Sequence, residues 1–195
     1  MAIDSYMAFK MYSGGPGGTG NWLEAESQVD FSKNSETLFQ QPIPLQQGHI
    51  FEVKEYSFDI EQQLNIGSAS RGAGAGKVTF NPFSVTRSVD KQSPIFFQMA
   101  CSGTPFGQVV LALRKSSGGD MTGQIFVRFD FKLVAVKTIS WSHDDEAPSE
   151  EITFEYGGLQ VRYAIQAASG AMDKVSIGGW NRVKNVADQG TTSIT

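Results

Sequence analysis

Few residues in this chain have the types and spacings that a catalytic, cofactor-binding or metal-binding site requires. Residues 15–20 read G-P-G-G-T-G, which matches the G-x-G-x-x-G fingerprint of dinucleotide-binding loops and follows a predicted strand. Such a site also needs a helix that opens at the last glycine and an acidic residue about twenty positions further on. Position 40 is Gln40, and no helical pattern follows Gly20. We therefore interpret residues 15–20 as a flexible loop.

Two further stretches lack residues that their suggested sites require. At residues 72–77, a phosphate-binding loop would need its first glycine where Arg71 stands, and a magnesium-binding serine or threonine where Val78 stands. Residues 143–146 (H-D-D-E) have metal-binding side chains, but consecutive residues cannot all point at one ion. We interpret residues 143–146 as a solvated acidic turn.

The single cysteine and the two histidines limit the chemistry further. Cys101 permits no internal disulfide, which favours folding in a reducing compartment, and its apolar surroundings in the sequence predict a buried, inert thiol. His49 and His143 cannot build a site of several imidazoles. No set of nucleophile, base and orienting residue is evident, so the sequence predicts a protein that is not an enzyme and has no metal or cofactor.

Composition favours a β-protein. The chain has 195 residues, of which 18% are charged and 21 are glycines, and this suits one domain (1–195) with many turns. A net charge of −4 offers no basic field for nucleic acid or anionic lipid, and no window reaches membrane-spanning length. Residues 3–12 resemble a strand and not a signal sequence. We therefore expect no nucleic-acid partner, no membrane insertion and, if the protein leaves the cell, export without a cleaved signal.

Alternating apolar residues predict strands along most of the chain. They cover residues 3–12, 49–64, 77–85, 109–113, 124–138, 151–156, 159–166 and the stretch around Trp180 to about 184. Changes of phase at Asn81-Pro82 and after Leu133 predict bulges or bends, and Gly157-Gly158 predicts a two-residue hairpin turn. Between the strands we expect a glycine-rich, insertion-like region at 13–48, a glycine-rich loop at 65–76, and a polar tail from about 185.

One short helix, at about 93–102, interrupts the strands. Ser93 can cap the first turn with its hydroxyl, Pro94 has the φ of a first helical residue, and Gly103 can close the helix in the left-handed conformation. The helix is apolar almost all round, so we expect it to be buried against the strands. The predicted fold is mainly β: a curved antiparallel β-barrel or sandwich with one short α-helix.

The helix and its neighbours resemble the Hcp family, the hemolysin-coregulated proteins of bacterial type VI secretion. The most specific part is a glycine-rich loop that enters G-K-V, then a strand, then D-K-Q-S-P and A-C-S-G. This motif comprises Asp90, Lys91, Ser93, Pro94, Ala100, Cys101 and Gly103. Strand-like pieces at 50–62, 106–118, 124–140 and 154–163 resemble the family in the same order, and region 13–48 is longer than the family's usual turn there.

The resemblance implies a structural role and an Hcp-like tail-tube fold. Family members form six-membered rings that stack into a tube, which a contractile sheath ejects under a spike protein and which carries or chaperones effectors in its lumen. By this resemblance the protein is a homohexamer that assembles in the bacterial cytoplasm and is then secreted. The predicted ring-stacking, inter-protomer loop comprises Asn65, Ile66, Gly67, Ser68, Arg71, Gly72, Gly74, Gly76 and Lys77.

Two alternatives stay open from the sequence. The first is the tube subunit of another contractile tail, of phage-like or extracellular type. The second is a ligand-binding β-sandwich that uses Trp22, Trp141 and Trp180 as an aromatic platform. A tube subunit would oligomerise without ligand, whereas a ligand binder would stay monomeric.

Overall fold

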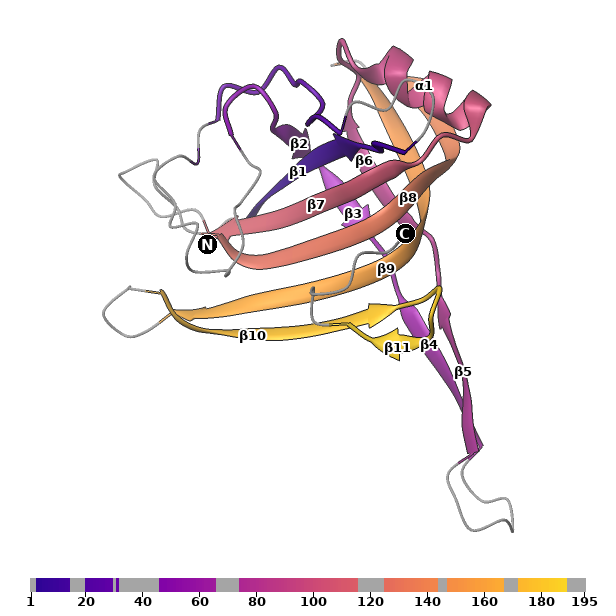
Figure 1. The fold of residues 1–195 in the computed structure, drawn as a ribbon. Helices are drawn as coiled ribbons and strands as arrows, with labels where there is room; N and C mark the ends of the chain where they lie inside the picture. Colours follow the sequence, from indigo (N-terminus) through magenta and orange to yellow (C-terminus); the bar gives the residue numbers. More distant parts are fainter. Residues whose placement is uncertain are drawn as a thin grey trace.

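The computed structural model describes residues 3–14, 20–29, 31, 46–65, 74–115, 125–143, 147–166 and 172–188. Over these residues the chain is mainly antiparallel β-structure with one short helix, which confirms the predicted fold class (Figure 1). In chain order the elements are β1 (Ile3–Met11), β2 (Phe51–Val53), β3 (Glu55–Ser57), β4 (Ile60–Asn65), β5 (Gly74–Phe80), β6 (Phe83–Ser88), α1 (Ser93–Ser102), β7 (Phe106–Lys115), β8 (Ile125–His143), β9 (Pro148–Gln166), β10 (Met172–Asn181) and β11 (Val186–Ala187).

A curved sheet holds most of the strands. Its order is β11-β10-β9-β8-β7-β1-β2, and β6 pairs with both β9 and β3. The longest strands, β8 and β9, have 19 residues each and pair along most of their length. Within the described residues, β4 and β5 pair only with each other, and they project from the sheet as a hairpin that we term the arm (Figure 1).

The sheet curls where β8 and β9 bend together. Leu133 has a φ of +49°, a left-handed conformation that leucine rarely adopts. Gly157 makes room for it, because a Cβ at Gly157 would lie 3.3 Å from the Leu133 side chain. The bend predicted after Leu133 is therefore confirmed. The hairpin predicted at Gly157-Gly158 is wrong, since both glycines lie inside β9.

One face of the sheet carries an aromatic core. Phe9, Phe83, Phe96, Phe131 and Phe154 have no exposed surface. The Phe83 ring stacks on Phe131 with centroids 4.3 Å apart, and the Phe96 ring of α1 meets Phe9 of β1 edge-on at 4.9 Å. Aromatic contacts thus join the helix to the sheet.

The opposite face of the sheet, which we term the second face, is buried as well. Residues that pair across neighbouring strands share a face. The register therefore places Arg128, Asp130, Gln160 and Arg162 together on the second face, and each is at most 5% exposed. The alternation in β8 predicts that Arg128 and Asp130 lie opposite the apolar residues, but it does not predict their burial.

Several strand boundaries differ from the predicted ones. The predicted strand 49–64 is three strands, because the chain changes partner from β1 to β6 and then to β5 as it passes round the curved sheet. Asn81-Pro82 is a break between β5 and β6 and not a bulge within one strand. The last predicted strand ends early at Asn181; a turn with Asn185 at φ +53° then leads into β11.

The described part of region 13–48 runs beside β1. Trp22 bridges Lys10, and the Leu23 backbone N–H donates to the Phe9 carbonyl at 2.8 Å. Phe31 is 5% exposed, and its ring meets Tyr6 edge-on at 5.0 Å on the second face. Most of the other residues of 13–48, and the turn predicted at 116–119, lie outside the described residues.

Candidate functional site

The arm contains the described part of the predicted ring-stacking loop. Asn65 pairs with Gly74, and Gly76 and Lys77 belong to β5. The loop predicted over 65–76 is therefore wrong at its C-terminal end, because pairing with β4 satisfies backbone groups that a free loop would leave to water. The remaining residues of the predicted loop lie outside the described residues: Ile66, Gly67, Ser68, Arg71 and Gly72.

Aromatic residues fix the root of the arm. Phe80, at the end of β5, is 5% exposed and meets the Tyr156 ring at 6.1 Å. Phe58, which precedes β4, meets the Phe129 and Phe131 rings at 5.2 and 5.6 Å. Burial raises the pKa of Tyr156 to about 12, because the ionised phenol would lose its hydration there. The root of the arm is thus apolar and packed against the sheet.

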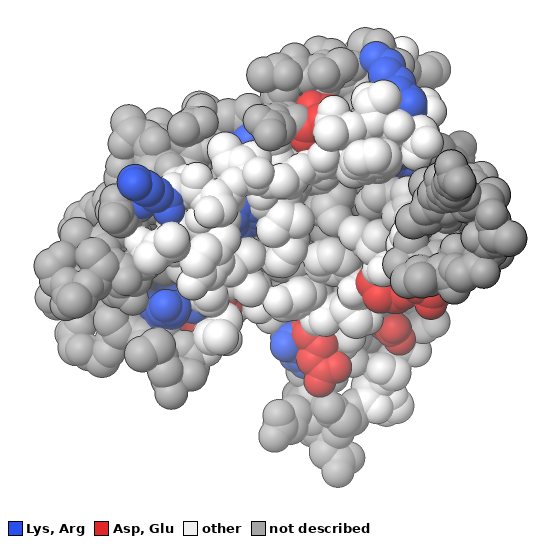
Figure 2. Space-filling model, turned by 90° about the horizontal axis from the view of Figure 1, so that it is seen from below, with Lys and Arg blue, Asp and Glu red and all other residues white. Residues whose placement is uncertain are grey.

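A groove of about 380 Å³ separates the arm from the sheet. Its lining is mostly apolar and consists of Ile60, Gln62, Val78, Phe80, Leu159, Val161, Gly178, Gly179 and Trp180. Tyr163 and Ile165 continue the Leu159 and Val161 face of β9 and are 43% and 48% exposed. Viewed from below the arm, charged side chains are few and lie toward the margins (Figure 2). The isolated chain therefore presents an apolar surface that a second protein could cover.

The family-motif helix is held by a buried ionic network, which we term the helix latch: Arg87, Asp90, Ser93 and Glu150. Arg87 pairs with Asp90, and its Nε lies 3.0 Å from Glu150 Oε1. Ser93 Oγ donates to the same Glu150 oxygen at 2.9 Å. Arg87 and Glu150 are 2% and 0% exposed, so each depends on the other for charge compensation.

Two further groups complete the surroundings of the latch. Trp141 Nε1 donates to Glu150 Oε2 at 3.0 Å. The Arg87 guanidinium lies 4.9 and 5.1 Å from the ring centroids of Phe51 and Phe96. Cation–π contacts and charged hydrogen bonds therefore join α1 to β2, β6, β8 and β9.

The helix ends agree with the sequence except at the cap. Pro94 lies in the first turn, and Gly103 has φ +68° and donates its N–H to the Met99 carbonyl at 2.9 Å, which confirms both predictions. Ser93 is not the N-cap. That position is Gln92, which has no side-chain capping bond. The Ser93 hydroxyl instead accepts from the Asp90 N–H at 3.1 Å, and Asp90 Oδ1 accepts from the Gln92 N–H at 2.8 Å.

The rest of the motif lies nearer the surface. Ala100 packs partly against the core, but Cys101 is exposed and Phe97 is 50% exposed, so the predicted burial of the helix and of its cysteine is wrong. The helix buries only one stripe, formed by Ser93, Phe96 and Met99. Lys91 pairs loosely with Glu24, at 3.6 Å, which joins the motif to region 13–48.

The described residues contain no grouping of three or more His, Cys, Asp or Glu that could hold a metal ion. The three tryptophans pack with different elements: Trp22 near Lys10 of β1, Trp141 near Phe97 of α1, and Trp180 in the groove. They therefore form no shared aromatic platform. No helix in the described part of the chain has the length and apolarity to cross a membrane.

Sequence reasoning missed Arg87 and Glu150. Arg87 stands three residues before Asp90, a spacing that could have suggested an ion pair next to the helix. Glu150 is a long-range partner, and no local pattern in the sequence marks it.

The chain resembles known proteins of one family. The profile of a family described as "Type VI secretion system effector, Hcp" matches residues 46–163. The curated protein hcp1 of Pseudomonas aeruginosa is 31% identical over 111 residues, which is 56% of this chain and 68% of that protein.

Solved structures share the fold. A type six secretion system protein superposes with a TM-score of 0.72 at 20% identity, covering 96% of this chain and all of its own. Hcp1 from Salmonella typhimurium gives a TM-score of 0.62 at 17% identity, again covering 96% of this chain. Both matches extend beyond residues 46–163.

Proposed function

Because the chain belongs to the Hcp family, whose members form the secreted inner tube of type VI secretion, we propose that six copies close into a ring and that the rings stack through the arm. The family is structural and not enzymatic. The observation that carries the proposal is the arm itself, a strand pair anchored at its root by Phe80 and projecting away from the sheet (Figure 1).

The groove and its continuation along β9 supply the surface for lateral contact. Ile60, Tyr163 and Ile165 are each between 43% and 48% exposed in the single chain. Covering such residues with a neighbouring copy contributes about 25 cal/mol for each Å² of apolar surface removed from water. Among the described residues, β11 and Asp188 pair with β10 only at Gly179, Trp180 and Asn181. A neighbour could therefore extend the sheet along the remaining edge of β10.

The other predicted partners follow from the family. We place a spike protein at the end of the stacked rings, a contractile sheath around them and effector proteins in the lumen. Assembly in the cytoplasm precedes secretion through the type VI machine. The residues of the arm and of the motif are the proposed assembly residues, the former for ring stacking and the latter for holding α1 on the sheet.

The first experiment measures the solution mass of the purified protein and images the same fraction by negative stain. Six copies of a 21.2 kDa chain correspond to about 127 kDa, and ring-shaped particles should appear. A clean monomer at high protein concentration would contradict the proposal. It would favour the ligand-binding alternative, which requires saturable binding by a single chain.

A second experiment separates stacking from ring closure. Replacing residues 66–73 by Asn-Gly keeps the β4–β5 pairing, because this dipeptide suits a two-residue hairpin turn. We expect single rings of unchanged mass and fewer stacks. Normal stacking by this variant would show that the tip of the arm does not join the rings.

A further inference from the structure

An uncharged group of apolar side chains lies on the outer side of α1. Phe97 of α1 and Trp141 of β8 are 50% and 52% exposed, and their ring centroids lie 6.1 Å apart. Pro94 and Cys101 are also exposed, and their spacing from Phe97 places all three on one side of the helix. We term Pro94, Phe97, Cys101 and Trp141 the aromatic patch. A contiguous exposed apolar group of this kind is typical of a surface that another protein covers.

The helix latch holds the aromatic patch in place. Trp141 Nε1 donates to Glu150 Oε2 at 3.0 Å, and Glu150 is the same residue that Arg87 and Ser93 bind. The indole is therefore fixed in the single chain, although about half of the residue stays exposed. Because the free chain already orders this side chain, covering it with a partner costs less conformational entropy.

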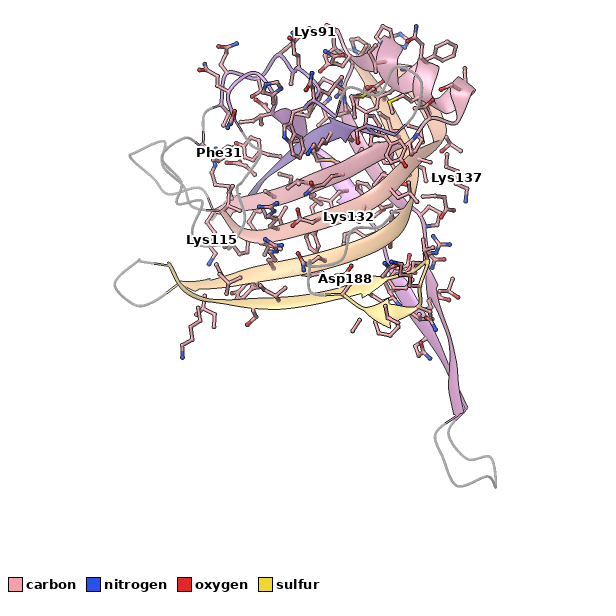
Figure 3. The ribbon with its side chains drawn as sticks, viewed as in Figure 1. Phe31, Lys91, Lys115, Lys132, Lys137 and Asp188 are labelled. Atoms are coloured by element: carbon pink, nitrogen blue, oxygen red, sulfur yellow. The ribbon has the colours of Figure 1, made fainter. Side chains whose placement is uncertain are left out.

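The patch and the helix that carries most of it have no charge. Residues 92–103 contain no Asp, Glu, Lys or Arg. Figure 3 labels one lysine before the first turn of α1, Lys91, and another below the helix, Lys137. Both pair with acidic residues, Lys91 with Glu24 at 3.6 Å and Lys137 with Glu155 at 3.1 Å. A partner can therefore cover the patch without burying an unpaired charge, provided that its own surface is apolar.

The aromatic patch and the groove lie at opposite ends of the sheet. Phe96 packs α1 against Phe9 of β1 and Phe51 of β2, with ring centroids 4.9 and 6.1 Å apart. The groove is formed by β9, β10 and the arm. The strand order β10-β9-β8-β7-β1-β2 separates these two ends, with α1 above the sheet and the arm below it (Figure 1). One copy therefore cannot place its own patch in its own groove.

We propose that the aromatic patch of one copy docks into the groove of the next copy around the ring. A ring built from a single kind of contact needs two different, complementary surfaces on each copy. The groove is the concave apolar surface, and the patch presents anchors on one side of a helix, as in other helix-in-groove contacts. This inference rests on the proposed ring, and it names the surface of the neighbour that faces the groove.

Cross-linking tests which two surfaces meet. Cys101 is the single cysteine of the chain and lies in the patch, and Ile60→Cys adds a thiol in the groove. A short bismaleimide should then join neighbouring copies into a ladder of up to six chains on a denaturing gel. The matched control is Ile3→Cys, at an exposed position of β1 outside the groove lining. The ladder should be roughly tenfold stronger than in the control, because docking holds the two thiols at high effective concentration.

Phe97→Lys tests the same contact through ring stability. The lysine stays hydrated in the single chain but loses water when the patch enters an apolar groove. The ring's dissociation constant should therefore rise by roughly tenfold to a hundredfold in sedimentation velocity. Val89→Lys is the matched control, since this 37% exposed position lies outside both the patch and the groove lining.

Rings that form without a ladder above the Ile3→Cys control would overturn this proposal. So would a Phe97→Lys chain that closes rings as tightly as Val89→Lys, or one that keeps its rings and loses only their stacking. Thermal unfolding shows whether Phe97→Lys folds, and if it does not, the cross-linking result decides. A parent chain that stays monomeric would contradict the proposed function itself, and this inference with it.

Discussion

The helix latch gives two residues of the D-K-Q-S-P motif, Asp90 and Ser93, a structural role. Asp90 pairs with Arg87 and accepts from the Gln92 N–H, while Ser93 donates to Glu150. These groups join α1 to a strand more than fifty positions away in the sequence, at Glu150. These two residues therefore attach the helix to the sheet.

Removing one partner of this network should destabilise the protein strongly. Arg87→Met would leave Glu150, which is fully buried, without its cation, and we expect a loss of about 3–5 kcal/mol in the free energy of unfolding. Urea titration followed by tryptophan fluorescence measures it. The matched control is Lys137→Met, because Lys137 and its partner Glu155 are 49% and 37% exposed. The control should cost under about 1 kcal/mol, and equal losses would contradict the role of the latch.

The raised pKa of Tyr156, at the root of the arm, predicts that the free energy of unfolding depends on pH. Its folded-state pKa is about 12 against an ordinary value of 10.0, chiefly because of burial, and its hydroxyl has no described hydrogen-bond partner. A raised pKa means that the stabilising contribution is complete below pH 10 and is lost as the pH rises toward 12. Between pH 9 and pH 12, Tyr156→Phe should therefore lose about 2 kcal/mol less unfolding free energy than the unchanged protein. Urea titrations at pH 9, 10, 11 and 12 test it, and parallel losses would contradict it.

At the scale of elements, β8 and β9 work as one bent unit. The bend places the strained Leu133 against Gly157, where a Cβ would meet the Leu133 and Val183 side chains at 3.3 Å. Gly157→Val should therefore cost about 1–3 kcal/mol by overpacking. Gly178→Val, at an open strand position, should change the unfolding free energy by about 0.5 kcal/mol or less. If Gly157→Val were equally mild in urea titration, the glycine would not be needed for the bend.

The sequence predicts those elements whose limits depend on neighbouring residues, and it fails for those that depend on residues far away in the chain. The limits of α1 follow from local residues, Pro94 and Gly103, and both predictions are confirmed. The role of Gly157-Gly158 does not follow from local residues. The same dipeptide suits a hairpin turn or a place where another side chain packs against the backbone, and only the distant Leu133 decides between them. The breaks within residues 49–64 have the same cause, since they depend on which strand lies alongside.

The candidate site likewise has features that the sequence predicts and features that it does not. The helix motif and the position of the arm follow from local patterns, whereas Glu150 and the burial of Arg128 depend on register across the sheet. Residues 130 and 160 read as solvated positions in their own strands. In the fold they lie side by side across β8 and β9 and are at most 5% exposed, because other parts of the chain pack over this face.

At the scale of the whole molecule, the two faces of the sheet differ in how far a single chain buries them. The groove side of the sheet is apolar and only sparsely charged (Figure 2), as expected of a face that meets another copy. The second face is polar and already buried within one chain. In the proposed ring, a neighbouring copy covers the groove side. One domain over residues 1–195 stays a prediction.

This division predicts that a charge in the groove weakens the ring without unfolding the chain. Ile60, at the base of the arm, is 47% exposed in the single chain and lines the groove, so a lysine there stays hydrated in the monomer but loses water when a neighbour docks. Ile60→Lys should raise the ring's dissociation constant by about tenfold to a hundredfold, which corresponds to about 1.4–2.8 kcal/mol. Sedimentation velocity over a dilution series measures this dissociation constant.

Val89→Lys, at a 37% exposed position that does not line the groove, is the matched control and should leave the dissociation constant unchanged. Thermal unfolding of both variants as monomers should match the parent chain. If Ile60→Lys formed rings as tightly as Val89→Lys, the groove would lie outside the contacts between neighbours, and ring closure would have to use the edge of β10 alone.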